Sequence, residues 1–290
     1  MGAVDTWALV PRGGCVWIAG ALLLTQVSQN SYAGIPKLTQ STGKSTLLNL
    51  LFGTEFGVMR EDRRQQTTRG IWAASDSSNI LVLDVEGTDG RERGDDQDFE
   101  RKSAVFSLSL AEVLIVNMWE AMVGLYNGAN LGLLRTVFEA NLLLFQLESS
   151  PKTALVFVIR DFTNTVPLDT LAETLTADLL AIWAALPKPQ GKETAEIVDF
   201  FVLSFQGIPH KLYAQQGFET EINQLKSRFY DSAHPQYLLN PEYHKGIPAD
   251  GFPKFADSIW EKIVTNKNLD LPSQQTMLAK YRCEEILKVC

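Results

Sequence analysis

The stretch LTQSTGKSTLLNLLFG, residues 38–53, decides the fold of this chain. Its GKS segment followed by an apolar run is typical of a phosphate-binding loop that opens a helix. Main-chain N–H groups of such a loop surround a phosphate, and the helix N-terminus adds partial positive charge. Gly43, Lys44 and Ser45 are therefore predicted to bind phosphate. The other predicted contacts are Gln40, Ser41, Thr42 and Thr46.

One residue of the full G-x-x-x-x-G-K-[ST] pattern is missing, because Leu38 stands where the first glycine belongs. Lys44 is still expected to reach the β- and γ-phosphates, and the Ser45 hydroxyl to ligate Mg²⁺. A leucine at a turn that needs φ > 0 costs about 1 kcal/mol or more. GKS before an apolar helix also occurs by chance, so the rest of the chain has to decide.

A second motif lies in NILVLDVEGTDG, residues 79–90. Its apolar run predicts a strand buried on both faces, and DVEG fits the D-x-x-G pattern of a nucleotide switch. Asp84 is expected to hold Mg²⁺ through water, and the Gly87 N–H to bond a γ-phosphate. A strand with an acidic turn is the plain alternative, but the order after GKS favours the switch.

Between these motifs, RRQQTTRGIW (residues 63–72) has the composition of a switch loop that runs into a strand. Such a loop needs a threonine hydroxyl for Mg²⁺, which Thr67 or Thr68 could supply, and Thr68 is preferred because GIW follows it closely. Taken alone, the stretch would be a solvated basic turn.

The fourth motif, TALVFVIRDF (residues 153–162), predicts a buried strand that ends in Arg160 and Asp161. A carboxylate there accepts hydrogen bonds from N1–H and the N2 amino group of guanine, whereas adenine presents a lone pair at N1. Asp161 therefore predicts guanine specificity and argues against an unrelated P-loop ATPase or kinase.

Helical and strand patterns alternate along the chain, which predicts a Ras-like α/β fold: a mainly parallel sheet with helices on both faces. Ligands of such a sheet bind at the carboxyl ends of its strands. Strands are expected at 70–75, 79–85, 113–119, 153–160 and 197–204. Helices are expected at 45–52, 99–111, 129–148, 168–186, 217–230, 254–266 and 272–289.

Together these segments resemble the guanylate-binding-protein type of G domain, and more closely its Root Hair Defective, atlastin-like branch of dynamin-family GTPases in its fungal form. The resemblance rests on QSTGKSTLLN, RQQTTRGIW, DVEGTDGRER and the Arg160–Asp161 pair. It implies hydrolysis of GTP to GDP with Mg²⁺, nucleotide-dependent dimerisation of two G domains, and tethering and fusion of membranes at the cytosolic face of the endoplasmic reticulum. Lys44 and Thr68 would take part in catalysis.

The resemblance runs from about Gln40 to the C-terminus, so the chain reads as a member truncated at both ends. It predicts a GTP-binding domain over 40–245 and the start of a helical bundle domain over 246–290. The family's membrane anchor is absent from these residues, and this fragment alone would be cytosolic.

Residues 1–39 do not resemble the family, and their structure is left open. Pro36 would remove an N–H from any central strand placed there. The apolar run at 15–24 is interpreted as a substitute edge strand or disorder, in preference to a secretory signal. Loss of the family's first strand would leave strand edges unpaired in the sheet's centre and weaken the protein.

Composition is consistent with a nucleotide enzyme. The net charge of −8 disfavours nucleic acid as a partner, and three cysteines and three histidines show no zinc spacing. The source of a catalytic arginine is open, because Ser41 takes the loop position where atlastins carry one. The candidates are Arg60, Arg63 and Arg64. The alternative to an active GTPase is an impaired fragment that binds nucleotide weakly and acts only as an interaction module.

Overall fold

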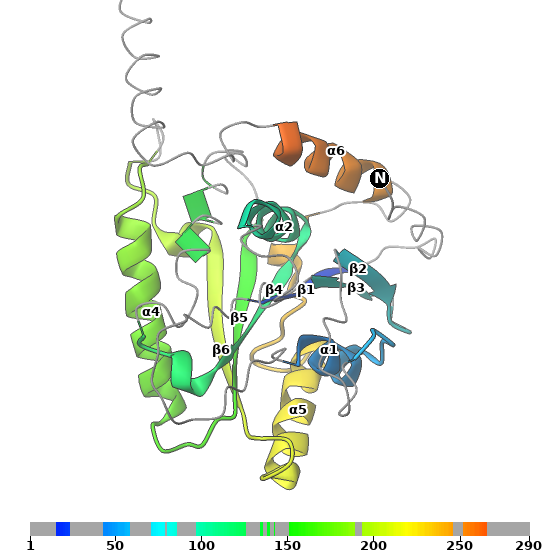
Figure 1. Ribbon diagram of the computed structural model, residues 1–290, viewed down its shortest axis with the longest axis vertical. Helices are drawn as coiled ribbons and strands as arrows, with labels where there is room; N and C mark the ends of the chain where they lie inside the picture. The colour runs from blue at the N-terminus through cyan, green and yellow to red at the C-terminus, as the bar shows by residue number, and fades with distance from the viewer. Residues whose placement is uncertain are drawn as a thin grey trace, which may run out of the picture.

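The computed structural model describes residues 16–23, 43–58, 71–78, 80–85, 97–125, 151–188, 193–245 and 252–265, with positions 134, 135, 138, 139 and 142. Its described strands form one six-stranded sheet in the order β2-β3-β1-β4-β5-β6 (Figure 1). Every pairing between these described strands is parallel except that of β2 with β3. The predicted Ras-like α/β fold, mainly parallel with helices on both faces, is confirmed.

The strands are β1 (Val16–Leu23), β2 (Ile71–Ser75), β3 (Ile80–Val85), β4 (Val113–Trp119), β5 (Thr153–Arg160) and β6 (Phe201–Ile208). The α-helices are α1 (Lys44–Phe52), α2 (Gln97–Leu110), α4 (Leu168–Ala184), α5 (Gln215–Tyr230) and α6 (Phe252–Thr265). Short 3-10 turns are η2 (Glu120–Met122), η3 (Ile197–Asp199) and η4 (Pro241–Tyr243). Within the described ranges, no helix combines the length and apolar character needed to cross a membrane.

Strand β1 lies in the middle of the sheet, between β3 and β4 (Figure 1). Ile18 is in register with Val82 on one side and with Val113 on the other. The expectation of an edge strand or disorder was wrong, and so was that of unpaired strand edges in the sheet's centre. Residues 16–23 do not resemble the family's sequence, but the ladder hydrogen bonds of a central strand need only an extended apolar stretch.

The pairing of β1 is incomplete toward its carboxyl end. It is in register with β3 at 16–18 only, while β4 follows it as far as Leu23. Between Ala19 and Leu22 the register with β4 shifts, so β1 carries one residue more than β4 there. A bulge of this kind bends the strand and increases its twist.

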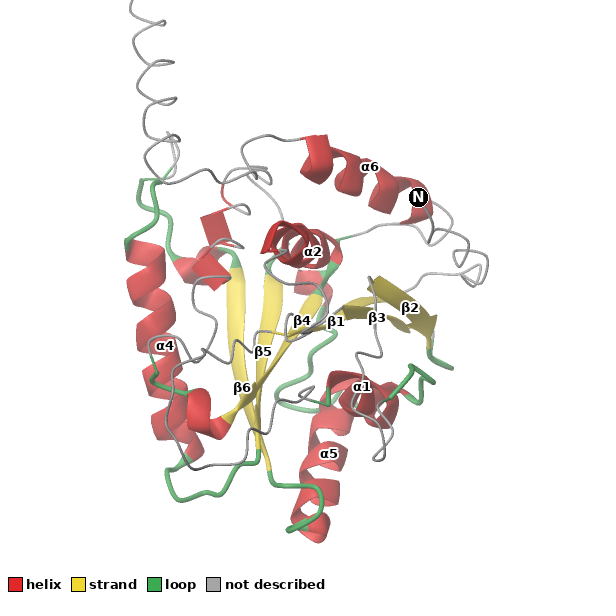
Figure 2. Cartoon of the chain, in the orientation of Figure 1, coloured by secondary structure: helices red, strands yellow, loops and turns green. Residues whose placement is uncertain are grey.

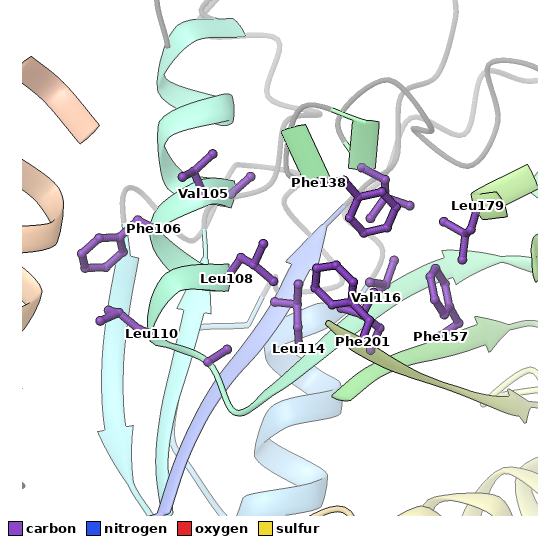
Figure 3. Close-up of a cluster of buried hydrophobic side chains, with 14 of the residues drawn as sticks. Val105, Phe106, Leu108, Leu110, Leu114, Val116, Phe138, Phe157, Leu179 and Phe201 are labelled. Atoms are coloured by element: carbon purple, nitrogen blue, oxygen red, sulfur yellow. The ribbon is translucent and has the colours of Figure 1, made fainter. Parts of the chain in front are cut away.

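Two hydrophobic layers cover the sheet, because β4 and β5 alternate their side chains between its faces. Leu114, Val116 and Phe157 point to the face covered by α2, α4 and α6 (Figure 3). Val113, Ile115 and Val156 point to the face covered by α1 and α5 (Figure 2). Burial on both faces explains why these strands are mainly apolar in sequence.

Most expected elements lie within a few residues of their predicted positions, and one strand does not. The strand expected at 197–204 begins at Phe201, because residues 197–199 form the turn η3, in which the Asp199 carboxylate accepts a hydrogen bond from the Glu196 N–H. In the expected helix 129–148, the described positions are helical, and Leu134, Phe138 and Leu142 are buried. The expected helix at 272–289 lies outside the described residues.

Helix α6, expected to belong to the start of a helical bundle domain, packs on α2. Trp260 meets Phe106 edge to face with ring centroids 5.4 Å apart, and Ile259 and Ile263 belong to the same buried cluster as α2. The predicted boundary at 245 remains a prediction.

Lys245 joins the segment before α6 to the end of α2. Its Nζ donates hydrogen bonds to the carbonyl oxygens of Leu108 (2.8 Å) and Ser109 (3.0 Å), and its main-chain N–H donates to Glu112 Oε1. Burial lowers the pKa of the Lys245 amine to about 7, against the attraction of Glu112. The amine also lies at the carboxyl end of α2, where the negative end of the helix dipole favours a positive charge.

The central place of β1 predicts that Ile18→Pro destabilises the chain by about 3 kcal/mol or more, because proline removes a ladder N–H in a strand interior. Val16→Pro is the matched control, since proline is tolerated at the first residue of a strand. Urea unfolding measures both. Equal stability of the two variants would show that β1 does not hold the sheet together.

The buried amine predicts a pH dependence of stability. The unfolded chain keeps the Lys245 proton up to a pKa near 10.5, whereas the folded chain releases it near 7. The unfolded state therefore binds more protons between these values, and the free energy of unfolding rises with pH by up to about 1.4 kcal/mol per pH unit. Lys245→Met should lack this rise when urea unfolding is compared at about pH 7 and about pH 9. An unchanged slope in the variant would contradict the assignment.

Candidate functional site

The start of α1 forms the described part of the predicted phosphate loop. Gly43 is the N-cap with φ 72°, and it has no side chain to occupy the N–H groups of the first turn. Lys44 and Ser45 are buried, and Thr46 is partly exposed. The helix is anchored by Leu48, Leu51 and other apolar residues and ends at Gly53, whose N–H donates to the Asn49 carbonyl. The N-terminal end of α1, at Gly43, can bind an anion through the N–H groups of its first turn.

Ser45 and Asp84 meet across the site. The Ser45 Oγ donates a 2.8 Å hydrogen bond to Asp84 Oδ2, and the Asp84 side chain is 1% exposed. The contact joins the first turn of α1 to the end of β3, as the two motifs required. Hydroxyl and carboxylate oxygens are hard donors of the kind that Mg²⁺ takes together with nucleotide phosphates. The described residues contain no cluster of three or more His, Cys, Asp or Glu that would hold a metal alone.

Arg160, the last residue of β5, reaches the same turn. A Cβ added at Gly43 would lie 3.2 Å from Arg160 Nη1, so the guanidinium sits against the loop backbone. The guanidinium carbon also lies 6.0 Å from the centroid of the Phe218 ring on α5. Burial lowers the pKa of Arg160, and the neighbouring Asp161 carboxylate raises it in part. Arg160 thus places a positive charge beside the predicted phosphate site.

Asp161 follows directly in a left-handed conformation, with φ 56°. Its side chain is partly buried, which raises the pKa of the carboxyl group, while electrostatic interaction with the neighbouring His210 and Arg160 lowers it in part. Because Arg160 is in register with Ile208 of β6, the loop after β6 begins beside Asp161. The predicted base-reading carboxylate therefore lies at the carboxyl end of the sheet, with Arg160 between it and the phosphate loop.

Sequence reasoning missed the loop after β6, residues 209–214. There His210 stacks on Tyr213 with ring centroids 4.4 Å apart, and His210 Nδ1 accepts hydrogen bonds from the N–H groups of Leu212 and Tyr213. The Tyr213 side chain is 88% exposed beside the carboxyl end of the sheet. The strand was expected at 197–204, whereas β6 ends at Ile208. With the earlier end, the PHKLY segment is not predicted to follow the strand directly.

Several predicted site residues lie outside the described part of the chain, so their roles stay predictions. They are Gln40, Ser41, Thr42, Thr68 and Gly87, together with Leu38, Thr67 and the candidate arginines Arg60, Arg63 and Arg64. The residues that the structure does bring together are Gly43, Lys44, Ser45, Asp84, Arg160 and Asp161.

Comparison with known proteins gives a consistent result. The family model for the Root hair defective 3 GTP-binding protein (RHD3) GTPase domain matches residues 38–272, so β1 lies outside the match. Protein sey1 of Schizosaccharomyces japonicus is 56% identical over 250 residues, which cover 86% of this chain and 33% of that relative. Protein SEY1 of Mycosarcoma maydis is 56% identical over 258 residues, which cover 87% of this chain and 30% of that relative.

The chain therefore spans about a third of the length of the curated relatives that it matches. Among solved structures, translation elongation factor SelB of Methanococcus maripaludis, in complex with a GTP analogue, overlaps 74% of this chain and 33% of its own at 11% identity. Its TM-score of 0.35 is too low to carry any argument.

Gly43 predicts a graded set of alanine variants. Gly43→Ala combines left-handed strain of about 1 kcal/mol with crowding of Arg160, so it should lose both stability and nucleotide binding. Gly53→Ala has the strain without the crowding and should lose stability alone. Gly57→Ala has neither and is the control. Urea unfolding and titration of a fluorescent guanine nucleotide measure the two effects. If Gly43→Ala binds like Gly53→Ala, the contact with Arg160 is unimportant for the site.

Proposed function

The chain belongs to the Root hair defective 3 GTPase family, and we propose on this basis that it binds GTP and hydrolyses it to GDP and phosphate. The observation that carries the proposal is the 2.8 Å hydrogen bond from Ser45 to Asp84. It brings the end of the GKS motif to the D-x-x-G motif, although the two lie far apart in the chain. In nucleotide switches these two motifs hold the same Mg²⁺ ion.

In this proposal each residue at the site has a separate task. Lys44 and the N–H groups at the start of α1 bind the β- and γ-phosphates. Ser45 and Asp84 would hold Mg²⁺, directly and through water, and Thr68 would add a further oxygen. Mg²⁺ bound with the nucleotide neutralises charge on the phosphate oxygens that it contacts. Asp161 accepts hydrogen bonds from guanine, and Gly87 bonds the γ-phosphate and releases it after hydrolysis.

The alternative of an impaired fragment loses one of its two supports. It rested on a missing first strand and on Leu38 in place of glycine. Strand β1 occupies the centre of the sheet, which removes the first reason. Leu38 lies outside the described residues and keeps the second reason open to measurement.

We further propose that the full-length protein acts at the cytosolic face of the endoplasmic reticulum, where nucleotide-dependent dimerisation of two G domains tethers and fuses membranes. Family membership supports this role. Exposed apolar side chains at the carboxyl ends of β4, β5 and β6 support an interface beside the nucleotide. They are Leu125, Val166, Leu212 and Tyr213.

Base selection gives the test. A fluorescent GTP analogue is titrated and competed with GTP, ATP and xanthosine triphosphate. The parent should prefer GTP, and Asp161→Asn should weaken GTP by roughly 10- to 100-fold while favouring xanthosine triphosphate, whose C2 oxygen needs a donor. Asp257→Asn, an exposed position on α6, is the matched control.

Two further outcomes separate the possibilities. Equal affinity of the parent for ATP and GTP would remove Asp161 from base reading. Tight GTP binding without phosphate release would favour the interaction module over the enzyme. Lys44→Ala, tested alongside, should abolish most nucleotide binding, because it removes the phosphate-binding charge.

A further inference from the structure

The backbone that carries Asp161 adopts the left-handed conformation, which is uncommon for residues other than glycine, although Asp and Asn adopt it more often than most. Asp161 has φ 56°, and Asn164, three residues later, has φ 57°. Contacts from neighbouring elements help to hold a turn of this kind. The direction of the Asp161 carboxylate therefore depends on the contacts that fix the turn at 161–164.

One contact lies directly after Asp161. The Phe162 N–H donates a 3.1 Å hydrogen bond to the Ile208 carbonyl, and the Phe162 ring lies against Gly207. A Cβ at Gly207 would come within 2.5 Å of that ring, so the closeness depends on glycine. This contact ties the loop to β6 but leaves the rest of the turn to be held from elsewhere.

Glu120, in η2 directly after β4, supplies the second contact. Its Oε2 accepts a 2.8 Å hydrogen bond from the Thr163 N–H, and its Oε1 accepts a 3.3 Å bond from Thr163 Oγ1. Thr163 Oγ1 also accepts from the Thr165 N–H, which extends the support toward α4. One carboxylate thus holds both the backbone and the side chain of the second residue after Asp161.

The register explains why Glu120 is in reach. Trp119 of β4 pairs with Arg160 of β5, so Glu120 and Asp161 each follow the same pair. Two carboxylates therefore leave adjacent parallel strands at the same level. Thr163 engages both oxygens of Glu120, which leaves the base-reading task to Asp161.

We propose that Glu120 is a positioning residue for guanine recognition: by binding Thr163, it holds the turn that aims the Asp161 carboxylate at the base. The inference rests on the proposed function, because it takes Asp161 to read guanine. It also gives a role to η2, the segment that directly follows β4.

The experiment compares the parent with Glu120→Ala and Glu120→Gln. Competition titrations measure affinity for GTP, for inosine triphosphate, which lacks the N2 amino group, and for inorganic tripolyphosphate, which has no base. Glu120→Ala should weaken GTP about fivefold and inosine triphosphate less, and leave tripolyphosphate unchanged. Glu120→Gln should restore the parent ratio, because its amide can accept from the Thr163 N–H and donate to Oγ1. Glu173→Ala, exposed on α4, controls for loss of a negative charge.

Asp161→Ala provides the coupling test, since adding Glu120→Ala to it should change GTP affinity no further. A parent-like ratio of GTP to inosine triphosphate affinity in Glu120→Ala would overturn the inference while leaving the proposed function intact. Equal weakening of all three ligands, with a lower melting temperature, would also overturn it, because that is a general structural effect. A parent that does not prefer GTP to ATP would overturn the guanine assignment and this inference with it.

Discussion

Hydrogen bonding of β1 to both of its neighbours holds the sheet together. Strands β2 and β3 lie on one side of β1 and strands β4, β5 and β6 on the other, so these two groups are joined only through it among the described pairings. Without β1, the facing edges of β3 and β4 would each carry a row of unpaired N–H and C=O groups. Leaving such groups buried and unpaired has a high free-energy cost. The positions of Asp84 on β3 and of Arg160 on β5 relative to each other depend on this strand.

From that sheet the site is assembled at one edge. Parallel strands end together, so β3 brings the Asp84 carboxylate and β5 the Arg160 guanidinium to the start of α1, and the Asp161 carboxylate directly follows β5. Arg160 contributes at both ends of this row, since its guanidinium lies against Gly43 while its backbone precedes Asp161. The groups proposed to bind phosphate and to read the base thus lie on separate elements that the sheet keeps in register.

Much of this could be predicted from the sequence, because β3, β4 and β5 are buried on both faces and are therefore mainly apolar. The approach of Ser45 to Asp84, and the place of Asp161 at the end of β5, could be predicted because these residues belong to short motifs. Three features escaped. The start of β6 was misplaced because Ile197 and Val198 are β-branched, which favours a strand, yet they form the turn η3. The position of the loop after β6 was therefore not predicted either. The contact of Glu120 with Thr163 depends on strand register, which no local sequence pattern indicates. The place of β1 depends on which strands have unpaired edges in the folded sheet, here β3 and β4.

The connection after β1 has a consequence of its own. Residues 24–42 separate Leu23 from Gly43, whereas a phosphate loop of the usual pattern joins its strand to its helix within a few residues. The start of α1 therefore does not by itself place β1, and the position of the strand is fixed by its pairing with β3 and β4. A substitution in β1 would reach the phosphate site through these two neighbouring strands, and not through a short loop shared by strand and helix.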